Sequence, residues 1–267
     1  MGAIVRYHGG KVRMSKHLIS LMPPRDCYVE PFGGGAAVLL ARPRSRLEVY
    51  NDLAGEMVTL FRMIRDRADD LAAVVAATPF ARAEHQVAQD LTVDDELEAA
   101  RRILIRSHFG HGSNGIYKST GFRAAGMRAG TLPCHLWAKL PPVIIETAER
   151  MRGVVIERRP AADVMLANDG PDTLHYVDPP YVRDTRGEGG DYKHEMDDAD
   201  HKELIDVLLS LRGAVVLSGY AHPIYDDALS DWRRVEIKAM ADKALKRTEV
   251  VWMNFADEAP LFASCVT

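Results

Sequence analysis

The chain has 267 residues and a formal net charge of −4, with 47% hydrophobic and 27% charged residues. This composition is typical of a globular protein with one large domain, or one domain with an insertion, and the small negative charge excludes nucleic-acid binding through the overall field. The three distant cysteines form no CxxC pair and no apolar run approaches the roughly 20 residues that cross a bilayer, so we expect a soluble cytoplasmic protein without a membrane span, metal site or disulfide framework.

Strand-like and helix-like segments alternate along the chain. The first strand-like run, residues 27–32, ends in three glycines, after which a helix begins. A second short run at residues 47–50 precedes a long segment at residues 55–77 with apolar residues at helical spacing. Such alternation predicts an α/β fold with parallel strands and helices on both faces. Later strands are expected at residues 154–157, 173–178, 214–220, 233–240 and 249–255, the last two as a hairpin, with a helix at residues 198–211.

The middle of the chain has a different texture. Residues 80–145 are richer in Gly, His, Arg and Ser than the segments on either side. We interpret them as a small, mostly helical insertion between two halves of one Rossmann-like domain, residues 1–79 and 146–267.

The first strand end has the features of a cofactor site. In "VEPFGGGAAVLL", residues 29–40, a strand leads through glycines into a helix, which is where open α/β sheets bind ligands. A glycine there lets a ligand approach the backbone closely. Asp52 follows the next strand, 19 residues after Gly33, where a carboxylate commonly binds ribose hydroxyls. The pattern indicates a nucleoside-containing cofactor, whereas NAD is disfavoured because the last glycine of the dinucleotide fingerprint is missing.

A second strand ends in "VDPPY", residues 177–181. The prolines make this segment stiff and unable to extend a sheet. The Asp178 carboxylate and the Pro179 carbonyl can each accept one hydrogen of an exocyclic amine, which exposes the nitrogen lone pair to an electrophilic methyl group. Tyr181 offers a ring on which the base can stack. A Pro-Pro turn capped by a buried tyrosine is the structural alternative.

With these motifs the chain resembles the Dam-type DNA adenine methyltransferases, which transfer a methyl group from S-adenosylmethionine to the 6-amino group of adenine. The resemblance covers most of the chain, and its motif order is that of the alpha group of amino-methyltransferases. It implies that the insertion recognises the DNA target. The matching segments are "RYHGGK" (6–11), "VEPFGGGAAV" (29–38), "YNDL" (50–53), "VDPPY" (177–181), "LSGY" (217–220) and "TEVVWMNF" (248–255).

The resemblance assigns roles to individual residues. It implies catalysis by Asp178, Pro179, Pro180 and Tyr181. For Asp163, which would face the cofactor adenine, capping of a short helix is an equally good interpretation. The residues implied to bind S-adenosylmethionine are Tyr7, Lys11, Glu30, Pro31, Phe32, Gly33, Gly34, Gly35, Asp52, Asp163 and Asp178.

A basic segment indicates where DNA would bind. Residues 101–139 contain seven Arg and Lys but no Asp or Glu, and aromatic residues are interleaved with them. Phosphate contacts from such a segment would give salt-dependent affinity, although a solvated basic face is the alternative. The loop after "VDPPY" is expected to be mobile and to order around an extruded base. The residues expected to contact DNA are Arg6, Arg102, Arg106, Lys118, Arg123, Arg128, Lys246 and Arg247.

Three other functions compete with DNA adenine methylation. Methylation of adenine in RNA or of the cytosine amine would use the same loop chemistry, and an inert nucleic-acid-binding relative would keep the fold. A NAD-dependent oxidoreductase is a more distant alternative. Methylation of the cytosine ring would need a nucleophilic Cys, and the Pro133-Cys134 pair lies away from the cofactor motifs. The sequence further predicts double-stranded DNA as the partner and no metal. It leaves open the oligomeric state, with which a monomer is compatible, and whether a separate restriction endonuclease is a partner.

Overall fold

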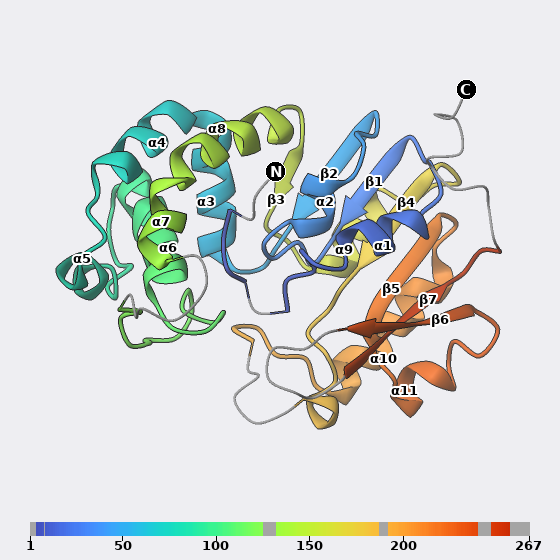
Figure 1. The fold of residues 1–267 in the computed structure, drawn as a ribbon. Helices are drawn as coiled ribbons and strands as arrows, with labels where there is room; N and C mark the ends of the chain where they lie inside the picture. Colours follow the sequence, from blue (N-terminus) through green and yellow to red (C-terminus); the bar gives the residue numbers. More distant parts are fainter. Residues whose placement is uncertain (1–3, 8, 125–131, 187–191, 240–246, 257–267) are drawn as a thin grey trace. The chain divides into compact units, whose positions relative to one another are not determined.

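The computed structural model describes residues 4–7, 9–124, 132–186, 192–239 and 247–256 (Figure 1). Contacts divide the chain into two compact units, which we call the helical unit and the sheet unit. The helical unit comprises Met1–Val12, Gly34–Ala41 and Ala54–Ile156, and the sheet unit comprises Arg13–Gly33, Arg42–Leu53 and Glu157–Thr267. No helix among the described residues is both long and apolar enough to cross a membrane.

The sheet is mixed. In spatial order, its strands within the described ranges are β3 (Val155–Glu157), β2 (Leu47–Asn51), β1 (Cys27–Glu30), β4 (Thr173–Val177), β5 (Ala214–Tyr220), β7 (Arg247–Met253) and β6 (Arg233–Ala239). β1 pairs in parallel with β2 and β4, and β4 with β5, whereas β7 runs antiparallel to both its neighbours. The strand order reverses between β1 and β4, so these two strands flank the switch point at which open α/β sheets bind ligands.

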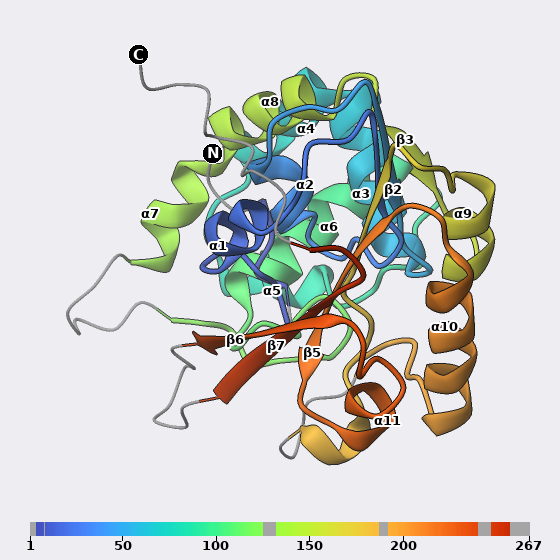
Figure 2. The same ribbon diagram turned by 90° about the vertical axis from the view of Figure 1, so that its right-hand side faces the viewer.

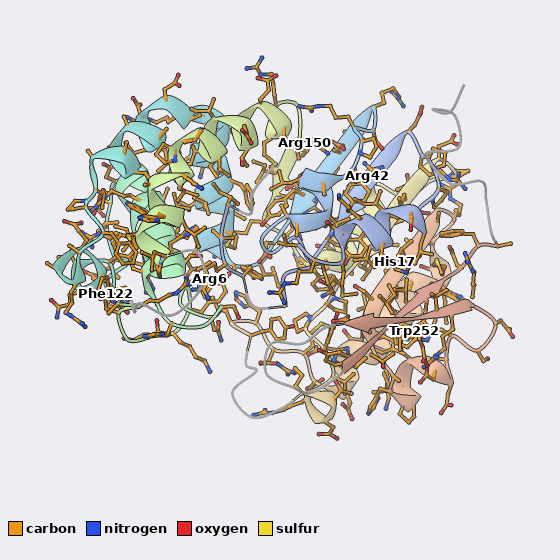
Figure 3. All side chains as sticks on the ribbon, in the orientation of Figure 1. Arg6, His17, Arg42, Phe122, Arg150 and Trp252 are labelled. Atoms are coloured by element: carbon orange, nitrogen blue, oxygen red, sulfur yellow. The ribbon has the colours of Figure 1, made fainter. Side chains whose placement is uncertain are left out.

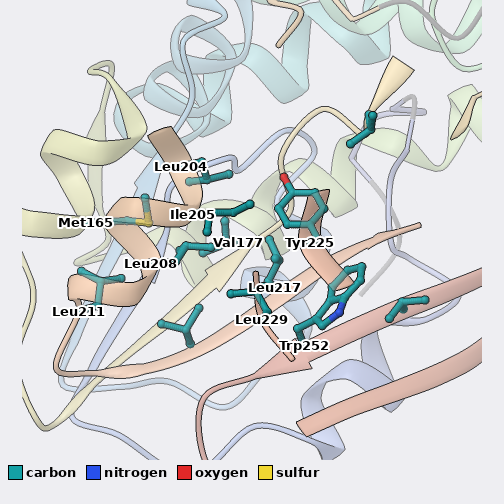
Figure 4. Close-up of a cluster of buried hydrophobic side chains, with 13 residues drawn as sticks. Met165, Val177, Leu204, Ile205, Leu208, Leu211, Leu217, Tyr225, Leu229 and Trp252 are labelled. Carbon is teal, nitrogen blue, oxygen red and sulfur yellow. The ribbon is translucent and has the colours of Figure 1, made fainter. Parts of the chain in front are cut away.

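One face of the sheet is covered by helices of the second half of the chain. These are α9 (Ala161–Ala167), α10 (Asp198–Ser210) and α11 (Pro223–Asp226). Their apolar residues pack with alternate residues of β4, β5 and β7 in one cluster (Figure 4). At its edge, Trp252 donates from its indole N–H to Asp226 at 3.1 Å, which gives the buried ring its polar partner. The cluster fixes β4, which leads into "VDPPY", and β5, which contains "LSGY".

The opposite face carries α1 (Ser15–Ser20) and a set of polar side chains. Figure 2 shows α1 on one side of the sheet and α9 and α10 on the other, so helices lie on both faces as expected. Side chains alternate across a strand, so the residues between those of the apolar cluster point to the α1 side. On this side the strands carry buried polar residues, namely Tyr28, Glu30, Glu48, Tyr176, Ser218 and Glu249.

The helical unit is built around one central helix. Its helices are α2 (Ala37–Ala41), α3 (Gly55–Asp66), α4 (Ala68–Ala77), α5 (Arg82–Val87), α6 (Glu96–Phe109), α7 (Pro133–Ala138) and α8 (Leu140–Met151). α6 contacts α3, α4, α5 and α7. Asp95 caps α6 by accepting from the backbone N–H of Leu97 at 2.9 Å. At the other end, Phe109 packs edge-on against Trp137, with ring centroids 4.7 Å apart.

The predicted α/β fold is confirmed, with two local differences. The first strand ends at Glu30 and not at residue 32, because Pro31 has no N–H with which to continue the ladder. The long predicted helix at residues 55–77 is two helices, because Arg67 leaves the helical conformation with φ −139° and ψ 44°. α3 and α4 pack against α6 and α8, so the helical unit begins before residue 80. Target recognition by residues 80–145 stays a prediction.

Candidate active site

Three acidic residues of the predicted motifs follow parallel strands of the sheet. Glu30 ends β1, Asp52 follows β2 and Asp178 follows β4. Carboxyl ends of neighbouring parallel strands meet at one edge of a sheet, and β1 and β4 flank the switch point. The fold therefore places the three carboxylates at the edge where the sequence predicted the cofactor and the reaction.

Asp178 is held by the next strand. The hydroxyl of Ser218 on β5 donates to Asp178 Oδ1 at 2.8 Å, and the Tyr176 hydroxyl lies 3.2 Å from Ser218 Oγ. Burial, followed by the nearby Asp178 charge, raises the pKa of Tyr176 well above its usual value. Tyr176 therefore stays protonated and donates a hydrogen bond to Ser218, and the Ser218 hydroxyl in turn donates a hydrogen bond to Asp178. These two hydrogen bonds fix the orientation of the partly exposed Asp178 carboxylate. The sequence analysis did not single out Ser218, although a small polar residue within "AVVLSGY" was a signal.

Tyr181 is more enclosed than its predicted role required. Its side chain is only 5% exposed, and its ring packs edge-on against Tyr220 with centroids 4.6 Å apart. Its hydroxyl donates to Glu249 on β7. The structure thus has the buried tyrosine of the structural alternative, whereas the acid before the prolines is partly exposed and held by Ser218. Stacking of a base on Tyr181 stays a prediction.

In the turn after β1, the rings of two tyrosines leave no room for a side chain at two of the glycine positions. A Cβ on Gly33 would lie 2.1 Å from a ring carbon of Tyr50, so no larger residue fits there without moving that ring. Gly34 has φ +47°, and a Cβ on it would lie 2.6 Å from the ring of Tyr7. These clashes alone require glycine at both positions. The expected approach of a ligand to this backbone stays a prediction.

Asn51 fixes the turn and was missed by the sequence analysis. Its amide donates to the carbonyls of Pro31 and Arg159 at 2.8 and 3.0 Å, and its Oδ1 accepts from the Arg159 N–H at 2.9 Å. Its backbone carbonyl accepts from the N–H of Gly33 at 2.8 Å. This fully buried side chain therefore ties the turn after β1 to the segment after β3. Its place next to Asp52 in "YNDL" was the available signal.

Glu30 belongs to a buried polar network on the α1 side of the sheet. Its carboxylate accepts from the Tyr28 hydroxyl at 2.8 Å, and burial, followed by the Glu30 charge, raises the pKa of Tyr28 well above its usual value. Arg42, labelled in Figure 3, lies 4.0 Å from the centroid of the Tyr28 ring and pairs with Glu48 at 3.1 Å. The bond from Tyr28 holds the Glu30 carboxylate in place at the end of β1.

The other predicted cofactor residues differ in exposure. Phe32 is partly buried against the apolar cluster, and Asp52 is partly exposed. Asp163 is exposed in the first turn of α9, whose N-cap is Pro160, so the helix-capping alternative is wrong. In the helical unit, Lys11 is buried and its ammonium donates to the carbonyl of Gly9 at 2.9 Å.

Tyr7 joins two parts of the helical unit. Its ring lies against Gly34 and Gly35, and its hydroxyl is 3.2 Å from that of Tyr117 in the predicted insertion. The segment before it follows the end of α6, since the N–H of Arg6 donates to Ser107 at 2.7 Å and the His108 ring donates to the carbonyl of Ile4 at 3.0 Å. These contacts span more than 100 residues of sequence, so none was expected from local patterns.

Several arginines that were predicted to contact DNA form hydrogen bonds or ion pairs within the helical unit. Arg106 is 7% exposed and donates to the carbonyls of Gly115 and Gln89, so we withdraw it as a phosphate contact. Arg102 pairs with Glu98 at 2.7 Å and also donates to a backbone carbonyl. Arg6 donates to the carbonyl of Gly110 at 3.2 Å. A pattern of like charges in the sequence did not reveal these partners.

Aromatic residues interleaved with those arginines are also largely internal. Phe109 lies between Phe80 and Trp137, with centroids 4.2 and 4.7 Å away, and Phe122, labelled in Figure 3, completes the group. Burial lowers the pKa of His108 to about 4, so this ring is neutral and cannot attract a phosphate. Of the predicted contacts, Lys118 is exposed and Arg123 is partly exposed. Arg128, Lys246 and the Arg247 side chain lie outside the described residues.

Comparisons with known proteins agree with this geometry. Residues 7–242 match the family described as D12 class N6 adenine-specific DNA methyltransferase. A search of curated proteins finds no match. Within the described residues no group of three or more His, Cys, Asp or Glu side chains could hold a metal ion. The family match covers most of the chain and includes the glycine turn, the basic segment and "VDPPY". The chain belongs to the D12 class of N6 adenine-specific DNA methyltransferases and is a DNA adenine methyltransferase.

Proposed function

We propose that this DNA adenine methyltransferase uses S-adenosylmethionine to methylate an adenine extruded from double-stranded DNA, with Asp178 and Pro179 as the acceptors of the target amine. The observation that carries this proposal is the bond from Ser218 to Asp178 at the carboxyl end of β4, beside the switch point of the sheet. It fixes one oxygen of the carboxylate in a stiff, proline-bounded segment, as a geometry-dependent reaction requires.

The sheet unit offers groups that suit the proposed methyl donor. Asp52 follows β2, a position from which a carboxylate commonly accepts from ribose hydroxyls, and the Phe32 side chain is partly buried. When bound, S-adenosylmethionine would supply an electrophilic methyl group on a sulfonium, whose carbon–sulfur bond breaks as the carbon–nitrogen bond forms. The roles of Glu30, Pro31, Gly33 and Asp163 in binding it rest on the resemblance, as do those of Tyr7, Lys11, Gly34 and Gly35 in the helical unit.

The protein's part in the reaction is orientation. Asp178 and the Pro179 carbonyl each accept one hydrogen of the 6-amino group, so the nitrogen lone pair points away from the plane of the base. After transfer the nitrogen carries a proton that Asp178 can accept and pass to solvent. Pro180 keeps the loop stiff. No covalent bond between enzyme and base is needed, in agreement with the absence of a Cys from "VDPPY".

Transfer of a radiolabelled methyl group tests the proposal. The purified protein is incubated with labelled S-adenosylmethionine and unmethylated plasmid DNA, and the DNA is then digested to nucleosides. We expect label in N6-methyladenine. One parallel reaction contains RNA, and another contains DNA that already carries N6-methyladenine. Label in RNA or in cytosine, with none in adenine of the plasmid, would contradict the proposal, as would equal labelling of the premethylated DNA.

DNA contacts by the predicted insertion give a separate prediction. Arg123→Ala is expected to weaken DNA binding and to reduce the slope of log K against log salt by about 1, because one phosphate contact releases about one counterion. Fluorescence anisotropy at several salt concentrations measures this slope. Arg152→Ala is the matched control, since Arg152 is a highly exposed arginine at the end of α8, outside residues 80–145. A slope that is the same in both variants and the wild type would contradict DNA binding through Arg123.

The remaining expectations are also proposals. We propose that the enzyme acts on DNA as a monomer and that it works in the cytoplasm, since the scattered cysteines support a reducing compartment.

A further inference from the structure

Glu249 is a buried acid that no part of the proposed chemistry uses. On β7 the side chains of Val250 and Trp252 belong to the apolar cluster, and strand alternation places Glu249 on the opposite, α1 side of the sheet. Its side chain is only 7% exposed. A buried carboxylate is costly unless it is hydrogen-bonded, so its position requires a partner.

That partner is the tyrosine of the catalytic loop. The Tyr181 hydroxyl donates to Glu249 Oε2 at 2.5 Å, within the range of a charge-assisted O–H···O⁻ bond. Burial, followed by the charges of Asp178 and Glu249, raises the pKa of Tyr181 well above its usual value. The phenol therefore remains a donor at any pH at which the enzyme works.

The same two strands hold both functional side chains of the loop. Tyr220 on β5 is the cross-strand partner of Glu249 on β7, and the ring of Tyr181 packs edge-on against that of Tyr220 at 77°. Two residues earlier on β5, Ser218 donates to Asp178. β5 and β7 therefore fix the acid of "VDPPY" through one hydrogen bond and its tyrosine through a hydrogen bond and a ring contact.

We propose that Glu249 is a positioning residue of this methyltransferase: through the Tyr181 hydroxyl it sets the Tyr181 ring and, with Ser218, the catalytic loop against which the target base is placed. This inference rests on the proposed function. Glu249 affects the rate of methyl transfer through Tyr181, and it does not affect binding of S-adenosylmethionine.

A double-mutant cycle tests the inference. The variants are Glu249→Ala, Tyr181→Phe and their combination, each assayed by single-turnover methyl transfer to DNA. We expect either single change to lower the rate about tenfold, the size of effect given by loss of a hydrogen bond to a charged group. The combination is expected to be no slower than either single variant, because both remove the same contact. KM for S-adenosylmethionine should stay within about threefold of the wild-type value.

Two further variants separate positioning from a general effect on folding. Glu249→Gln keeps an oxygen acceptor for the Tyr181 hydroxyl and is expected to retain a rate within about threefold of wild type. Glu236→Ala is the matched control, because Glu236 is an exposed acid on the neighbouring strand β6, paired in register with Val250. It should leave the rate unchanged. If Glu249→Ala does not fold, Glu249→Gln and Tyr181→Phe carry the test.

The outcomes distinguish this inference from the proposed function. Rate losses that multiply in the combined variant, or a Tyr181→Phe rate equal to wild type, would overturn the positioning role while the enzyme remains a methyltransferase. An equal fall in Glu249→Gln and Glu249→Ala would also overturn it. A wild type that labels no adenine would contradict the proposed function instead. In that case the same double-mutant cycle, measured by thermal unfolding, would still detect the contact between Glu249 and Tyr181, but the catalytic role of Glu249 would be contradicted.

Discussion

Replacement of Asp178 by alanine is expected to abolish methyl transfer to DNA in practice, with a fall in rate of about a thousandfold, as for loss of one well-placed polar group from a preorganised site. In the proposed reaction Asp178 supplies one of two acceptors that orient the amine, and the Ser218 bond holds its carboxylate in place. Binding of S-adenosylmethionine should stay within about tenfold, because Asp178 is only one of several residues that we propose to bind it.

The measurement pairs a rate with an affinity. Tritium incorporation into DNA gives the rate, and isothermal titration gives the dissociation constant of S-adenosylmethionine for the same preparation. Asp172→Ala is the matched control, since Asp172 is an exposed acid just before the other end of β4. Equal losses of rate and affinity in Asp178→Ala would count against its role at the target amine.

The sheet was predictable because its signals are local. Strands such as "AVVLSGY" are apolar runs bounded by turn residues, and the expected range 214–220 is that of β5. The break at Arg67 was not predictable, because the residues on both sides favour helix. Its position depends on tertiary packing, since α3 contacts α6 and α4 contacts α8. Local patterns likewise could not show that α3 packs in the helical unit.

The position of an acid at a strand end was predictable where a motif fixes which residue follows the strand. Glu30 and Asp178 needed only the strand and its end, since parallel strands of an α/β sheet bring their carboxyl ends together. The partners of the "VDPPY" side chains come from distant strands: Ser218 on β5 binds Asp178, and Glu249 on β7 binds Tyr181, and no local pattern names either partner. The prediction that Arg106 contacts phosphate was wrong for a related reason: the charge of an arginine in a sequence does not show that its guanidinium is buried against two carbonyls.

The buried pair of Arg42 and Glu48 gives the largest expected effect on stability. Their side chains are 1% and 3% exposed, and the guanidinium also lies over Tyr28. Arg42→Ala leaves the Glu48 carboxylate buried without its partner cation, so we expect the free energy of unfolding to fall by about 3–5 kcal/mol. Urea unfolding followed by circular dichroism measures the change. Arg46→Ala is the control, because Arg46 forms an exposed pair with Asp26 and should change stability by less than about 1 kcal/mol.

A paired replacement then separates the cost of an orphaned charge from the value of the pair. In Arg42→Met with Glu48→Leu neither charge of the pair is left buried without the other, so most of the lost stability should return. The bond from Tyr28 to Glu30 remains in this double variant, and we therefore expect S-adenosylmethionine to bind within about threefold of wild type. A double variant as unstable as Arg42→Ala would show that the stacked guanidinium itself stabilises the sheet. Recovered stability with lost cofactor affinity would show instead that the ion pair acts through Tyr28 on Glu30, which would make a buried salt bridge part of the cofactor site.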